Sequence, residues 1–192
     1  MTQLSREEIL DQIRSGQSLA GINMTGVDLS YESLKGVNLS GLDLREAHLQ
    51  NCNLEGANLS GSNLESAFLF GANLHKANLS GALLSEANLQ DSNLDEANLV
   101  KATLCHTSLF GSSLEKADLT DADLSRARMK RANLRHATLH RANLQNVHIE
   151  RADLTGATLA GANLTNTNFT NAIIKQTDLT DAILEGAIGL PG

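Results

Sequence analysis

Few side chains in this chain are of the types that carry chemistry, and none stands in a recognised catalytic or ligand-binding motif. The 192 residues include six histidines and two cysteines. No P-loop, G-x-G-x-x-G, C-x-x-C or H-E-x-x-H pattern is present. Two weaker constellations remain. His75 with Asp95 could form an acid–base dyad, and Glu86, Cys105 and His106 could supply three ligands to zinc.

The composition excludes several classes of protein. The formal net charge of −7 excludes a generally basic nucleic-acid binder. No apolar run approaches the roughly 18–20 residues that span a bilayer, and the first 16 residues carry five charges and no apolar segment of a secretory signal. Hydrophobic residues make up 41% of the chain, but aromatic residues only 3%. We therefore expect a packed, cytoplasmic protein whose core differs from that of an ordinary globular enzyme.

A repeat of five residues dominates the sequence. An apolar residue recurs at every fifth position from Leu19 to Leu184, which makes 34 pentads without an insertion. This central position is Leu in 29 pentads, the residue two places earlier is Ala in 20, and the residue just before the centre is Asn or Asp in 20. A period of five fits neither a helix nor an alternating strand. Each unit must therefore make about one turn, with one large and one small apolar side chain inside and turn-forming residues outside.

Units such as Ala57-Asn58-Leu59-Ser60-Gly61 resemble the A-(D/N)-L-x-x signature of the pentapeptide repeat family, and the resemblance covers residues 17–186. It implies an all-β solenoid, a right-handed quadrilateral β-helix with four pentads per coil. The 34 pentads then give about 8.5 coils and a rod roughly 41 Å long. Residues 20 apart stack on one another. We expect an N-terminal α-helical cap (1–16), the pentapeptide-repeat β-helix (17–187) and a C-terminal tail (188–192).

Residues 4–16 are predicted to form the capping helix. Ser5 is a suitable N-cap, Glu8 completes a capping box, and Gly16 is well placed to end the helix. An apolar stripe along the helix should cover the first open coil, because solenoid ends need capping; docking of a partner is the alternative. The stripe consists of Ile9, Leu10 and Ile13.

Two further positions do not fit the simple repeat: Glu32 near the N-terminal end, and the last coil at the C-terminal end. Glu32 occupies an inward position, where an unpaired carboxylate would be costly. We expect either a local distortion near Tyr31 or an outward-turned Glu32 side chain. The residues expected to cover the last coil are Ile183, Ile188, Leu190 and Pro191.

The implied stacking argues against chemistry at either constellation. His75 and Asp95 would lie on an open, convex side of the rod, where no pocket excludes water. We therefore expect no catalytic residues, no cofactor and no metal. Cys52 should point inward and Cys105 outward, roughly 12 Å apart along the rod, which is beyond the reach of a disulfide. Two free thiols fit a reducing compartment.

Charged side chains form two kinds of surface feature. Opposite charges alternate along stacked columns, as in Lys35 with Glu55, and should be solvated ladders of little energetic weight. Residues 126–151 carry a net charge of +6. Wrapped around the rod, these bases would form a girdle on all four sides, either a solvated band or a docking site for an acidic partner. Its bases are Arg126, Arg128, Lys130, Arg131, Arg135, Arg141 and Arg151. Bases on all four sides cannot follow one duplex, so direct nucleic-acid binding is not expected.

Outward aromatic side chains are the second candidate interaction surface. Phe68, Phe70 and Phe110 are predicted on one side of the rod. Exposed aromatic residues often mark protein interfaces, although these rings could also fold against a neighbouring corner.

The resemblance implies a role in protein contacts. Members of the family abound in cyanobacteria and include regulators, for instance in heterocyst differentiation. We expect a bacterial, non-enzymatic interaction or scaffold protein with an acidic protein partner, no membrane contact and a monomeric state, with end-to-end association left open. One alternative is a DNA mimic that binds DNA gyrase or topoisomerase. This chain differs from the DNA-mimic subgroup in three ways. Its central residue is Leu, it lacks a C-terminal dimer helix, and it carries the basic girdle. An enzyme or metal-binding protein is the second alternative.

Overall fold

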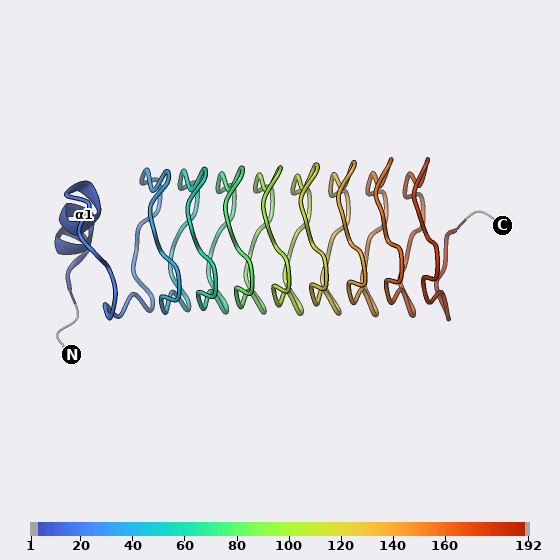
Figure 1. The fold of residues 1–192 in the computed structure, drawn as a ribbon, viewed down its shortest axis with the longest axis horizontal. Helices are drawn as coiled ribbons and strands as arrows, with labels where there is room; N and C mark the ends of the chain where they lie inside the picture. Colours follow the sequence, from blue (N-terminus) through green and yellow to red (C-terminus); the bar gives the residue numbers. More distant parts are fainter. Residues whose placement is uncertain (1–3, 191–192) are drawn as a thin grey trace.

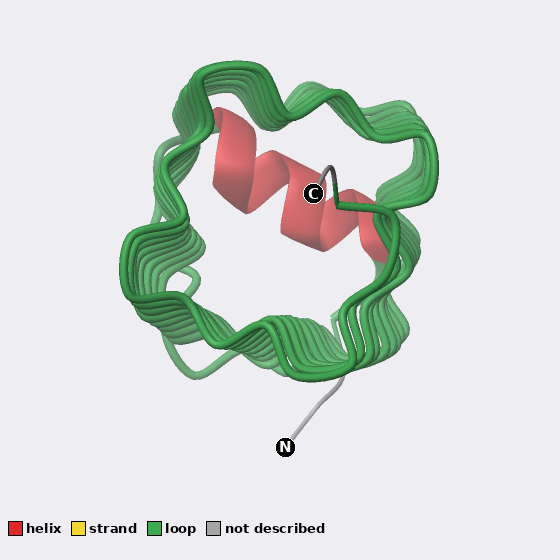
Figure 2. Ribbon diagram, turned by 90° about the vertical axis from the view of Figure 1, so that its right-hand side faces the viewer, coloured by secondary structure: helices red, strands yellow, loops and turns green. Residues whose placement is uncertain are grey.

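The computed structural model describes residues 4–190 as a rod of stacked coils with one helix at its N-terminal end (Figure 1). Parallel β-bridges join residues 20 apart, from Asn23 with Asp43 to Asn168 with Ile188. Each coil therefore takes 20 residues, or four pentads, as expected. Viewed along the rod, the coils have four sides and lie in register (Figure 2).

Each side of a coil contributes a single bridge residue rather than a strand. Within residues 4–190 the ladder consists of isolated bridges, and no continuous strand forms. The expected β-helix therefore differs in this detail, because the chain bends at a corner two residues after every centre, although the amides of Asn58, Leu59 and Gly61 all bond to a neighbouring coil. The second residue after each centre forms the corner, with a left-handed backbone even where it is not glycine, as in Arg126 (φ 60°) and Arg131 (φ 63°). The corners thus place large side chains at the edges of the rod.

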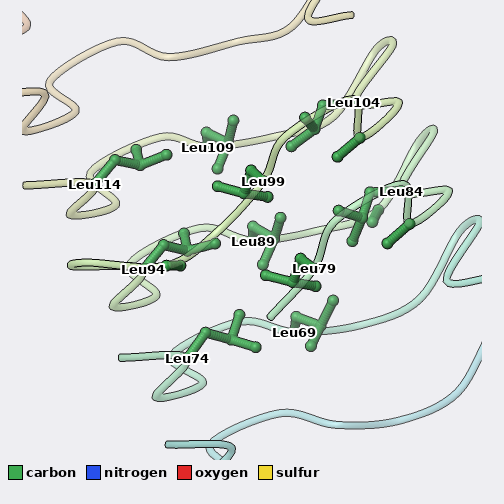
Figure 3. Close-up of a cluster of buried hydrophobic side chains, with 14 of the residues drawn as sticks. Leu69, Leu74, Leu79, Leu84, Leu89, Leu94, Leu99, Leu104, Leu109 and Leu114 are labelled. Carbon is green, nitrogen blue, oxygen red and sulfur yellow. The ribbon is translucent and has the colours of Figure 1, made fainter. Parts of the chain in front are cut away.

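The core is a column of stacked leucines, one from each side of every coil. Leu69, Leu89 and Leu109 lie above one another and point inward (Figure 3). They are fully buried, as are most of the alanines two residues before each centre. Polar residues that replace these alanines bond to the backbone: the Cys52 thiol donates to the Leu29 carbonyl at 2.8 Å. The inward predictions for Leu, Ala and Cys52 are confirmed.

Helix α1 spans Arg6–Arg14 and lies across the N-terminal end of the rod (Figure 2). The Ser5 side chain accepts a hydrogen bond from the Glu8 amide, and the Glu8 carboxylate accepts one from the Ser5 amide, which completes the predicted capping box. Gly16 ends the helix with φ +67°. The helical residues buried in the core are Ile9 and Leu10. Among residues 4–190 no helix is long and apolar enough to cross a membrane.

Glu32 does not distort the repeat. The backbone at Tyr31 has φ 65°, like the other corners, and the bridge pattern continues through it. The half-buried Glu32 carboxylate instead accepts a hydrogen bond from Arg6 Nη2 at 2.7 Å. Arg6 Nε also donates to the Asp28 carbonyl at 2.9 Å. The carboxylate at this position of the repeat is therefore neutralised by Arg6 of α1, an arrangement that the five-residue pattern did not predict.

The C-terminal end of the rod is more open than expected. Ile183 and Ile188 are the outward bridge residues of the last coil and are exposed, so they do not fold over it. The central Leu184 is 41% exposed. Leu190 is half-buried and packs against the core, whereas Pro191 lies outside the described residues. The prediction that Ile183 and Ile188 cover the last coil is wrong.

Removal of α1 should cause end-to-end association. Deletion of residues 1–15 exposes the apolar interior of the first coil, onto which the open C-terminal coil of a second copy can stack. We expect concentration-dependent oligomers of the truncated chain by analytical ultracentrifugation and no such concentration dependence for the full chain. The milder substitution Leu10→Asp should act in the same direction. A truncated chain that stays monomeric with an unchanged melting temperature would show that α1 is not a cap.

The thiol of Cys52 should make stability depend on alkaline pH. Burial raises its pKa from the ordinary value of 9.0 to about 11. The folded state holds this proton more tightly than the unfolded chain, so the stabilisation is complete below pH 9 and is lost as the pH rises towards 11. We expect the free energy of unfolding to fall by on the order of 2 kcal/mol across this window in urea titrations. The free energy of unfolding of the Cys52→Ala variant should fall less over the same pH range. An equal fall in both proteins would contradict the assignment of this pH dependence to the Cys52 thiol.

Candidate interaction surface

The 20-residue coil sorts outward side chains into columns, because bridge partners lie 20 residues apart. One of the four sides runs along the pentads centred on Leu69, Leu89, Leu109 and Met129. We call this side, together with the corner column that precedes it, the aromatic–basic face. Its aromatic and basic side chains are Tyr31, His48, Phe68, Phe70, His106, Phe110, Arg126, Arg128, Lys130, Arg131, His148 and Arg151.

Five of the seven bases predicted to form a girdle lie on this one face: Arg126, Arg128, Lys130, Arg131 and Arg151. All five are exposed, and within residues 4–190 none has an acidic group within 4.0 Å. Arg135 and Arg141 lie on two other sides, paired with Asp153 at 3.1 Å and Asp121 at 2.7 Å. The girdle prediction is therefore wrong, because four of the bases fall within one pentad and its two corners.

Bases elsewhere on the rod are mostly paired. Seven of the ten bases outside the aromatic–basic face form an ion pair in the described structure. The predicted ladder pair of Lys35 and Glu55 is present at 3.0 Å. Hydrogen bonds from the Arg141 guanidinium lower the pKa of Asp121, which keeps that pair ionised. The unpaired positive charge of the described residues is therefore concentrated on one side.

The aromatic residues lie on the same face. Phe68 and Phe70 are 40% and 42% exposed, as predicted for outward positions. Phe110 is half-buried, and the Arg131 guanidinium carbon lies 5.8 Å from the centre of its ring, within range of a cation–π interaction. The His48 and Phe68 rings are 4.8 Å apart. The two surfaces that the sequence suggested separately are one surface.

Two adjoining grooves hollow this face. The first, which we call the corner groove, has a volume of about 720 Å³ and is lined by Glu86, His106, Arg126, Arg128, Asn146 and His148. The second, of about 470 Å³, is lined by Gln90, Ser108, Phe110, Arg128, Lys130, His148 and Glu150. Arg128 and His148 belong to both grooves. His106 and His148 were not predicted as part of an interaction surface, although grouping residues by their place in the 20-residue coil would have found them.

A sequence model described as pentapeptide repeats matches the chain in eight copies, over residues 38–75, 72–111, 112–151 and 149–186. The chain belongs to the pentapeptide repeat family. Proteins of this family form right-handed quadrilateral β-helices, in agreement with the four-sided coils described above. No match was found among curated protein sequences.

Solved pentapeptide repeat structures resemble this member of the family. HetL, involved in heterocyst differentiation regulation in the cyanobacterium Nostoc sp. strain PCC 7120, is 34% identical over 97% of this chain and 94% of its own, with a TM-score of 0.56. A protein of the Arabidopsis thaliana thylakoid lumen is 40% identical over 52% of this chain and 69% of its own, with a TM-score of 0.51. QnrB1, a plasmid-mediated fluoroquinolone resistance protein, is 18% identical over 84% of this chain and 89% of its own, with a TM-score of 0.34.

The suspected dyad of this pentapeptide repeat protein is not assembled. His75 and Asp95 line the same shallow groove, of about 190 Å³. The Asp95 carboxylate accepts hydrogen bonds from the Ser113 hydroxyl and the Glu115 amide. Among residues 4–190 no hydrogen bond joins it to His75. The imidazole therefore lacks the orienting partner that an acid–base dyad needs.

The suspected zinc ligands point to different partners. Glu86 and His106 line the corner groove, but the Cys105 thiol lies 3.2 Å from Asp123 Oδ2 and 3.3 Å from Ser125 Oγ. Burial raises the pKa of Cys105, which favours the thiol over the metal-binding thiolate. No cluster of three metal-binding side chains occurs in the described part of the chain.

Proposed function

We propose that this pentapeptide repeat protein is a non-enzymatic interaction protein that binds an acidic protein partner through the aromatic–basic face. One observation carries the proposal: the five bases without an ion pair and the three outward phenylalanines share a single side of the rod. Exposed aromatic rings beside arginines have the composition of the energetic centres of protein interfaces.

The charge cluster makes the free protein less stable than a paired arrangement would. Arg131 and Arg151 are stacked neighbours on adjacent coils, where like charges repel each other. Other columns of the same rod avoid this cost by alternating charges, as Lys76 does with Glu96 at 3.5 Å. An acidic partner would relieve the repulsion on binding, and its field would also steer association.

The same proposal places the protein in the cytoplasm as a monomer. The free thiols of Cys52 and Cys105 support a reducing compartment. The likeness to HetL supports a regulatory role exerted through protein contacts, as part of the proposal.

Affinity capture from native lysate tests the proposal. The face variant carries Arg126→Gln, Arg128→Gln, Lys130→Gln and Arg131→Gln. The control carries Lys35→Gln, Lys76→Gln, Lys116→Gln and Arg135→Gln, and loses the same number of charges from the neighbouring side. Circular dichroism first establishes that both variants fold.

We expect a partner that the wild type and the control capture and the face variant does not. Equal capture by all three proteins would exclude the aromatic–basic face as the binding surface. A DNA gyrase supercoiling assay addresses the DNA-mimic alternative: the proposal predicts no inhibition, and dose-dependent inhibition would favour the mimic.

A further inference from the structure

The corner groove gathers hydrogen-bond donors around one point of the aromatic–basic face. Arg126 follows His106 and precedes Asn146 in the corner column, each 20 residues from the next. Arg128 and His148 are bridge partners on the adjoining side. All of these side chains line one open groove of about 720 Å³. Side chains from three successive coils thus face a common space.

The two arginines of the groove are free to bind a ligand. Both are exposed, and neither has an acidic group within 4.0 Å among residues 4–190. Their stacked neighbours are histidines, Asn146 and Ser108, which carry no negative charge. Arg135 and Arg141, by contrast, already donate to the carboxylates of Asp153 and Asp121.

A phosphate monoester matches this donor set better than a carboxylate does. It carries a charge of about −1.5 to −2 near neutral pH and presents three acceptor oxygens. A guanidinium group donates two parallel hydrogen bonds to such an anion. Two guanidinium groups, with imidazole and amide donors beside them, can serve all three oxygens at once. A carboxylate has only two oxygens and one charge, so it offers the two arginines fewer acceptor positions and less charge than a phosphate monoester does.

Two acids limit where the anion sits: Glu86 lines the groove, and Glu150 borders it, paired with His148 at 3.3 Å. Glu86 is two coils away from Arg126 in the corner column, roughly 10 Å by the usual strand spacing. It repels an anion at its own end and leaves the Arg126 and Arg128 end as the favourable position. There the second groove begins, with Phe110 as its apolar wall. An apolar residue next to the phosphorylated one would reach this ring.

We propose that the corner groove binds the phosphate of a phosphorylated serine or threonine in the protein partner, through Arg126 and Arg128 with His106 and Asn146. This inference rests on the proposed function and names the chemistry of the partner. An apolar side chain next to the phosphorylated residue packs against Phe110.

Peptide titrations on the full chain test the inference. The probes are a short phosphoserine–leucine peptide and its serine and glutamate counterparts, followed by heteronuclear NMR. The phosphopeptide should shift the side-chain signals of the groove and bind at least about tenfold more tightly than either counterpart, as expected when two charge-assisted fork contacts are gained. Inorganic phosphate should shift the same arginine signals at higher concentration.

Matched variants locate the site. Arg126→Gln with Arg128→Gln should abolish the preference for the phosphopeptide. Arg135→Gln with Arg141→Gln removes the same charge from paired positions and should keep the preference. An equal affinity for the phosphorylated and glutamate peptides, or an equal loss in both variants, would overturn the inference.

The inference and the proposed function fail separately. Suppose that the face variant loses the partner, but the wild type still captures it after phosphatase treatment of the lysate. This result would support the aromatic–basic face as the binding surface and overturn the phosphate site. Suppose instead that the phosphopeptide binds at the corner groove, but the partner binds another side of the rod. This result would support the phosphate site and overturn the proposed function.

Discussion

Leu99→Ala is expected to lower the free energy of unfolding by about 3 to 5 kcal/mol. Leu99 is fully buried in the middle of the rod, stacked over Leu79 in the column of central leucines (Figure 3). The rigid backbone of neighbouring coils cannot collapse into the space left by the lost methyl groups, so a cavity remains. Each coil contacts only its neighbours, and the weakened interface therefore lies between two halves of the solenoid. Urea denaturation followed by circular dichroism measures the effect.

Leu184→Ala provides the matched control. It removes the same atoms from the same pentad position, but Leu184 is 41% exposed at the open C-terminal end. No coil stacks over it within the described residues, so its loss should cost less than about 1 kcal/mol. Similar costs for the two substitutions would contradict the view that stability comes from coil-on-coil burial.

Phe68→Ser combined with Phe70→Ser is expected to weaken binding of the captured partner by about thirtyfold or more. The two rings are 40% and 42% exposed and lie on the same side of the rod as the unpaired bases, three coils away from Arg128 and Lys130. Their loss removes apolar contact area from the interface but leaves the core intact. The melting temperature should therefore change little. Surface plasmon resonance with the purified partner measures the affinity.

Leu83→Ser combined with Ile173→Ser controls for the loss of exposed apolar surface. These side chains are 40% and 44% exposed but lie on other sides of the rod. They should leave the affinity unchanged. If both double variants weakened binding equally, general surface hydrophobicity rather than the aromatic–basic face would explain the interaction.

The five-residue repeat predicted a solenoid of stacked turns with the leucines inside, and the resemblance to the pentapeptide repeat family implied the four-sided coil. A leucine every five residues cannot be buried by a helix or a flat sheet, and the turn residues between the leucines close each coil. The capping box of Ser5 and Glu8 was equally predictable, since it depends on contacts within one turn of helix. Both features depend on contacts between residues that are close together in the sequence.

Features that depend on contacts between distant coils were not predictable in the same way. The pairing of Arg6 with Glu32 joins α1 to the first coil, and the exposure of Leu184 depends on how the final residues pack against the last coil. Counted along the chain, the bases of residues 126–151 predict a girdle around the rod. Sorted by their place in the 20-residue coil, most fall on one side, which also carries Phe70.

Photo-cross-linking in cells tests the central claim most directly. Benzoylphenylalanine replaces either Phe70 on the aromatic–basic face or Ser80, half a coil away on the opposite side. We predict a discrete cross-linked partner from position 70 and none from position 80. The same cross-linked product from both positions, or a product from position 80 alone, would contradict the claim that the aromatic–basic face is the interaction surface.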